Sequence, residues 1–113
     1  MEKIVLEELL TVLGKTFDDT LIVDDVLGPY FIIHYKDGGW GVMKTRRDSN
    51  NNLKYRVVGY PSTFAGCLDT VASAEQNEEG KIYESIQSYI SNWKEICFKI
   101  RNVYKDWNIK DVK

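Results

Sequence analysis

The sequence predicts an α+β fold: an N-terminal helix, an antiparallel meander of three to four strands, then two helices, the last one long. Three observations support this prediction. Apolar residues at helical spacing open the chain, β-branched and aromatic runs divided by turn residues fill its centre, and a long regular apolar stripe occupies its end. With 113 residues, 43% of them hydrophobic, the chain is expected to form a single domain over residues 1–113.

The first helix is expected over residues 2–13. Ile4 and Leu9 belong to its apolar side, whereas Glu7 lies on the side facing water. Gly14 supplies a stop, because glycine enters the left-handed conformation of a helix C-terminus without steric cost.

Strands are expected in the centre of the chain, where turn residues separate four runs. The first run, LIVDDV, is short enough for an edge strand, and the others cover residues 30–36, 40–47 and 53–60. Asp37-Gly38-Gly39 is a strong hairpin signal, and the polar cluster of residues 48–52 predicts a second turn.

Two helices are expected after Pro61. Ser62 or Thr63 can cap the first of them, which has a single apolar face. The second helix is predicted by a stripe of alternating three- and four-residue steps, made of Ile82, Ile86, Tyr89, Trp93, Ile96, Ile100, Val103 and Trp107. It should run for about 25 residues, or about 37 Å.

The expected strand register gathers four cations on one face of the sheet. If residues 48–52 form the second turn, the facing pairs are Lys44 with Arg56, Arg46 with Lys54, and Trp40 with Tyr60. The Asp37-Gly38 hairpin is expected to add Phe31, Ile33 and Tyr35 to this face, leaving Tyr30, Ile32 and His34 on the other.

These six paired residues are a candidate binding face, with Trp40 or Tyr60 available to stack on bases. Like charges opposite one another destabilise a sheet slightly, so two such pairs favour an anionic partner, either nucleic acid or an acidic protein surface. The alternative is a hairpin tip whose charges serve only solubility. The net charge of −2 does not exclude this site, because residues 30–60 carry six basic and two acidic side chains.

The last helix is a second candidate binding surface. Its stripe can cover the sheet as a core face, or its outer part can pack against another protein or a second copy of this chain. The candidate residues for such a contact are Trp93, Phe98, Arg101, Tyr104 and Trp107.

Catalytic chemistry is not expected. His34 is the only histidine, and Cys67 and Cys97 form neither a disulfide framework nor a zinc site, so we expect no metal and no cofactor. Two carboxylate doublets lie at residues 18–19 and 24–25. The two side chains of each doublet point to opposite faces of an extended segment, so neither doublet is a good acid–base pair. No apolar run is long enough for a membrane span and no signal peptide is evident, so a cytoplasmic protein is expected.

The order of elements invites comparison with double-stranded RNA-binding domains, but residues 61–80 lack the basic side chains those domains use to grip phosphates. The segment WGVMKTRRDSNNNLKYRVVGYP, followed by a Tyr-Pro-Ser helix start and a long charged helix, resembles small phage- and prophage-encoded proteins of unknown function. The resemblance covers residues 30–104 and implies an accessory protein of a mobile element. It supplies no functional residues.

The function expected from these observations is a non-enzymatic accessory or inhibitor-type factor that binds a host or phage protein, directed at host or defence machinery. Two alternatives stay open. One is nucleic-acid binding through the basic hairpin face, and the other is a small-molecule or nucleotide-signal binder with its ligand between sheet and helix. A homodimer through the last helix is a further expectation.

Overall fold

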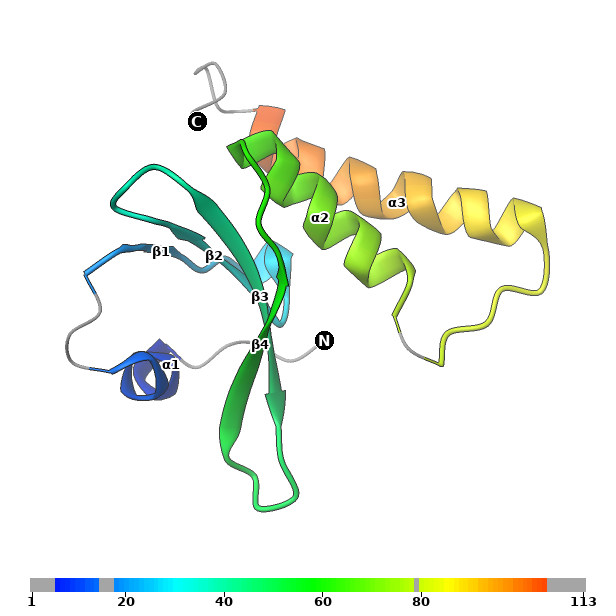
Figure 1. Ribbon diagram of the computed structural model, residues 1–113. Coiled ribbons are helices and arrows are strands. Elements are labelled where there is room, and N and C mark those ends of the chain that lie inside the picture. The colour runs from blue at the N-terminus through cyan, green and yellow to red at the C-terminus, as the bar shows by residue number, and fades with distance from the viewer. Residues whose placement is uncertain (1–5, 15–17, 79, 106–113) are drawn as a thin grey trace.

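The computed structural model describes residues 6–14, 18–78 and 80–105, with the backbone alone described over 101–105. Its elements are α1 (Leu6–Leu13), β1 (Thr20–Ile22), a short 3₁₀ helix (Asp25–Leu27), β2 (Tyr30–His34), β3 (Trp40–Arg47), β4 (Leu53–Gly59), α2 (Phe64–Gln76) and α3 (Ile86–Lys105) (Figure 1). The four strands form one antiparallel sheet in the order β1-β2-β3-β4. The predicted α+β class and element order are confirmed. No described helix is long and apolar enough to cross a membrane.

The sheet is covered by helices on both faces, as Figure 1 shows, with α1 on one side and the α2–α3 pair on the other. The larger core lies under α2 and α3 and contains Tyr30, Ile32, Trp40, Val42, Phe64, Cys67, Val71, Ile96 and Ile100. The smaller core lies under α1 and contains Leu9, Phe31, Ile33, Met43 and Leu53. Both faces of β2 are therefore buried, which explains why its sequence is apolar without alternation.

Turn chemistry sets the ends of the strands. Gly38 has a φ of 104°, and its N–H donates to the Tyr35 carbonyl over 2.9 Å. At the second turn the Asp48 carboxylate accepts backbone N–H bonds from Asn50 and Asn52, each 2.9 Å long. The hydrogen bonds to its carboxylate oxygen lower the pKa of Asp48.

The side chains of β2 lie on the opposite faces of the sheet from those predicted, because the first hairpin has a different turn length. Its turn contains three residues, since the Tyr35 N–H donates to the Gly39 carbonyl over 2.8 Å and His34 pairs with Trp40. Our expectation corresponds to a two-residue turn, and a difference of one residue moves every side chain of a strand to the other face. The face of Trp40 and the cations therefore holds Tyr30, Ile32 and His34, while Phe31, Ile33 and Tyr35 lie on the α1 face.

The second hairpin has the expected register over most of its length. Lys44 pairs with Arg56 and Arg46 with Lys54, but a bulge at Val42/Met43 shifts the pairing, so that Val42 lies opposite Gly59. The predicted contact between Trp40 and Tyr60 is therefore wrong. A bulge adds one residue to one strand and so reverses the alternation of side chains beyond it.

The first helix ends where the sequence predicts, and the last helix begins one turn later than expected. Residues 2–5 lie outside the described part, and α1 ends before Gly14, which has the predicted positive φ, at 95°. The long helix begins at Ile86 instead of Ile82, because the Ser85 hydroxyl accepts the Ser88 N–H over 3.0 Å and caps it there. Its 20 residues correspond to about 30 Å.

Candidate functional site

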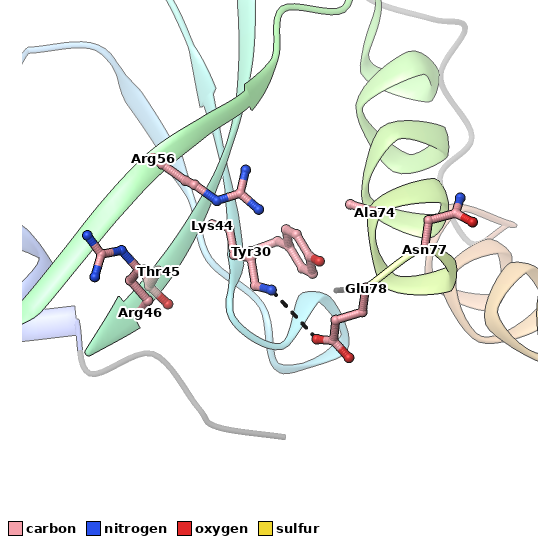
Figure 2. Close-up of a pocket in the computed structure, with 8 residues that line it drawn as sticks. All are labelled: Tyr30, Lys44, Thr45, Arg46, Arg56, Ala74, Asn77 and Glu78. Atoms are coloured by element: carbon pink, nitrogen blue, oxygen red, sulfur yellow. Dashed lines mark ion pairs between the residues drawn. The ribbon is translucent and has the colours of Figure 1, made fainter. Parts of the chain in front are cut away.

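The four predicted cations lie near the turn of the β3–β4 hairpin. Strand pairing places Lys44 beside Arg56 and Arg46 beside Lys54 on one face, as the sequence predicts. Between this face and the C-terminal end of α2 lies a groove of about 710 Å³. Figure 2 shows the residues that line it, which are Tyr30, Lys44, Thr45, Arg46, Arg56, Ala74, Asn77 and Glu78.

Lys44 is the most enclosed of the four cations. Its Nζ lies 3.6 Å from Oε1 of Glu78 across the groove, and 5.6 Å from the centre of the Tyr30 ring (Figure 2). Arg46, Lys54 and Arg56 are exposed, and within the described residues none of the three makes an ion pair. The groove therefore keeps a positive charge that its single acidic lining residue does not balance.

Tyr30 forms the apolar floor of the groove. Its pKa is raised, first by burial and then by the negative charges of Glu78 and Glu75. The phenol consequently stays protonated at neutral pH. Tyr30 pairs with Lys44 across β2 and β3, which brings its ring under the ammonium group.

The two aromatic residues predicted to accompany the cations do not lie with them. Trp40 is buried, with its ring stacked on His34 at 3.9 Å and tilted against Phe64, so it offers no platform for a base. Tyr60 is 68% exposed, but its ring lies 6.4 Å from that of Tyr35. Because Tyr35 belongs to the α1 face, Tyr60 is separated from the basic groove by the sheet.

The apolar stripe of α3 is covered over only half of the helix. Ile96 and Ile100 are buried in the larger core, whereas Ile86 is 80% and Trp93 36% exposed. Tyr89 and Ile90, which lie between them, are exposed to a similar degree as Trp93. Figure 1 shows why: the α2–α3 pair projects from the sheet, and the N-terminal end of α3 lies farthest from it. We call Ile86, Tyr89, Ile90 and Trp93 the exposed stripe.

The other predicted α3 residues are less defined. Phe98 is 62% exposed and lies off the stripe, as expected. Arg101 and Tyr104 belong to the backbone of α3, but their side chains lie outside the described part, as does the whole of Trp107.

A buried polar cluster holds the exposed stripe in place, and the sequence analysis missed it. Gln76, at the end of α2, is completely buried, and its amide donates to the Tyr89 carbonyl over 2.8 Å. Its side-chain oxygen accepts a hydrogen bond from Asn92. The Tyr83 hydroxyl also donates to the Gln76 carbonyl over 2.8 Å, which ties down the segment before α3. The signal was present, because Gln76 follows Ala72 by four residues and so falls on the buried face of α2.

The groups considered for catalysis have structural roles in the described residues. Burial raises the pKa of Cys67 to about 12, so its thiol stays protonated at neutral pH. Asp18 pairs with Lys36 at 2.8 Å, Asp19 accepts the Lys36 N–H, and Asp24 caps the 3₁₀ helix through the Val26 N–H. Among the described residues no cluster of three histidine, cysteine or carboxylate side chains could hold a metal ion.

Comparison of the chain with protein-family models, with curated proteins and with solved structures found no match. The arrangement defines an α+β protein with two separate surface features, a basic groove beside the β3–β4 hairpin and an exposed apolar stripe on α3.

Proposed function

We propose that this chain is a non-enzymatic protein-binding factor that docks on its partner through the exposed stripe of α3. The observation that carries the proposal is the continuity of one apolar stripe, from the buried Ile96 and Ile100 to the exposed Ile86 and Ile90. A helix face whose lower half is core and whose upper half is open offers ready-made apolar area to a partner.

The rigidity of the stripe supports the same proposal. Gln76 bonds to the backbone of α3 at Tyr89 and to the side chain of Asn92, so the exposed turns are held by α2 before any partner arrives. A surface that is already ordered loses little conformational entropy on binding. The spacing of the exposed side chains matches an amphipathic helix of the partner, which would lie along α3 with its own apolar stripe.

The partner we propose is a cytoplasmic host or phage protein, with the chain acting as a phage accessory factor directed at host or defence machinery. Support for this part comes from the resemblance over residues 30–104, carried by the hairpin segment 40–61.

The test compares two neighbouring substitutions that add the same charge. Ile90→Asp alters the exposed stripe, whereas Ser91→Asp alters an exposed residue beside it. We expect affinity purification with mass spectrometry to recover the same protein with the native chain and with Ser91→Asp, and to lose it with Ile90→Asp. Recovery that is equal for both variants, or absent with the native chain, contradicts the proposal.

Light scattering after size-exclusion chromatography separates a partner from a second copy. If the exposed stripe binds a different protein, the chain alone should be a monomer, in place of the homodimer that the sequence allows. A dimer that Ile90→Asp dissociates would assign the stripe to self-association and overturn the proposal of a different partner.

Nucleic-acid binding is the second candidate, and the observation that favours it is the pairing of Lys44 with Arg56 and of Arg46 with Lys54. It predicts a complex in about 50 mM salt that is lost steeply as salt rises, because bound phosphates regain their counterions. A gel shift with single- and double-stranded oligonucleotides tests it. Absence of a complex at low salt removes this candidate.

A further inference from the structure

The outer edge of β4 carries hydrogen-bonding groups that the described residues leave unused. β4 is the last strand of the sheet and has seven residues, which is long for an exposed edge. On β3, the Thr45 N–H donates to the Pro29 carbonyl over 2.8 Å, so Thr45 points its backbone groups toward β2. Tyr55 lies opposite Thr45, and the alternation of an antiparallel ladder therefore points the N–H and C=O of Tyr55 away from β3.

The side chains along this edge differ between the two faces. On the groove face Lys54 and Arg56 are exposed, and their β3 neighbours Lys44 and Arg46 add to the positive charge. On the α1 face Tyr55 is 39% and Val57 43% exposed, although both are apolar. An added strand would meet cations on one face and apolar side chains on the other, at every second residue.

We propose that the β4 edge binds an extended segment of a partner protein in which acidic and β-branched residues alternate. Its backbone would pair with Tyr55, its acidic side chains would lie against Lys54 and Arg56, and its apolar side chains would cover Tyr55 and Val57. This surface is separate from the exposed stripe of α3 and extends the protein-binding function to a second contact.

The charges of the edge decide between an acidic partner and a second copy. Two β4 strands that paired edge to edge would set the basic side chains of one copy against those of the other. Basic residues on an edge strand are a common means by which proteins prevent such pairing. The same residues attract an acidic strand, which makes the edge selective.

The experiment uses the full chain and a fluorescent peptide of about eight residues in which glutamate and valine alternate. Fluorescence anisotropy should show binding that weakens with salt, and amide hydrogen exchange should show protection of the Tyr55 N–H when the peptide is bound. A peptide of the same composition with its glutamates and valines in separate blocks should bind at least about tenfold more weakly.

Matched variants locate the site. Arg56→Glu should weaken the alternating peptide by about tenfold or more, whereas Lys94→Glu, an exposed cation on α3, should leave its affinity unchanged. Ile90→Asp should also leave it unchanged, so failure of the α3 proposal and failure of this one are distinguishable.

Four outcomes would overturn the proposal. The first is equal binding of the two peptides, and the second is no change in the exchange of the Tyr55 N–H when the peptide binds. The third is protection of the Tyr55 N–H in the free protein. The fourth is a single-stranded oligonucleotide that displaces the alternating peptide and itself protects the Tyr55 N–H. The third outcome would mean that the edge is already covered by this chain or by a second copy. The fourth would assign the edge to nucleic acid.

Discussion

At the scale of single residues, Gln76 shows how one buried polar side chain fixes the position of a surface. Its amide group contacts the Tyr89 carbonyl and Asn92, so the first turns of α3 are bonded to the end of α2. An apolar residue at this position would remove these hydrogen bonds from a part-buried cluster.

Gln76→Leu is therefore expected to destabilise the protein by about 2–3 kcal/mol, because several part-buried hydrogen bonds are lost together. Urea unfolding followed by circular dichroism measures the change. Gln87→Leu is the control, because Gln87 is exposed on α3 and its replacement should change the free energy of unfolding by less than about 0.5 kcal/mol. Equal effects of the two substitutions would mean that the Gln76 contacts contribute nothing to stability.

On the α1 face of the sheet, the ion pair between Arg47 and Glu8 should make the stability of the protein depend on pH. Arg47 donates to both oxygens of Glu8, over 2.6 and 2.7 Å, and this hydrogen bonding together with the positive charge lowers the pKa of Glu8. A carboxylate whose pKa is lower in the folded state stabilises the protein above its unfolded pKa, and the contribution disappears as pH falls through the folded value.

Glu8→Gln should thus lower the melting temperature at neutral pH, and the difference from the native chain should shrink below about pH 4. Thermal unfolding between acid and neutral pH measures it. Glu7→Gln changes the adjacent exposed residue and should leave the pH profile as it is. A difference between Glu8→Gln and the native chain that stays constant down to the acid end would contradict the assigned role of the pair.

At the scale of elements, the sequence was sufficient for type and order but not for every side-chain direction. Periodicity predicted β3 and the cation pairs of the second hairpin, because the five-residue turn and alternation define them. The predicted side-chain directions along β2 were wrong. Asp37-Gly38-Gly39 is compatible with a two-residue and with a three-residue turn, and these two turns direct the β2 side chains to opposite faces of the sheet. The bulge at Val42/Met43 was not predicted, although a glycine inside a strand, here Gly59, can mark one, and it displaced Tyr60 from the predicted site.

The same turn provides a test at this scale. Gly38 has a φ of 104°, whereas neighbouring Gly39 does not have a positive φ, and a Cβ on Gly39 would meet only Tyr35, at 3.7 Å. Gly38→Ala should destabilise the protein by about 1–3 kcal/mol, because alanine is strained at such a φ. Gly39→Ala should cost less than about 1 kcal/mol. Chemical unfolding measures both changes. A larger destabilisation by Gly39→Ala than by Gly38→Ala would show that the positive φ does not lie at Gly38.

For α3 too, the sequence predicted the element but not its exact bounds. The apolar stripe correctly predicted a long final helix, but not that Ser85 would cap it at Ile86 and leave Ile82 outside. Nor could periodicity distinguish the half of the stripe that is core from the half that is open. That distinction depends on where α2 ends and on how far α3 projects past it, which are properties of the tertiary packing.

At the scale of the whole molecule, one sheet separates two apolar layers, and the same strands contribute side chains to both. Phe31 and Ile33 of β2 pack toward α1, while Tyr30 and Ile32 of the same strand pack toward α2 and α3. Loss of the small layer should therefore loosen the strand that carries the large one. The described part of α1 has eight residues, and a helix of that length is not stable alone in water, so its contribution has to come from this packing.

Leu9→Ala tests the coupling, because Leu9 is fully buried among Phe31, Ile33, Met43 and Leu53. The substitution should destabilise the whole fold by about 2–4 kcal/mol and raise amide exchange at Val71, on the far side of the sheet, by the corresponding factor. Leu10→Ala is the control, since Leu10 is largely exposed and should cost less than about 1 kcal/mol. If exchange at Val71 does not change while α1 unfolds, the two layers are independent and the sheet does not couple them.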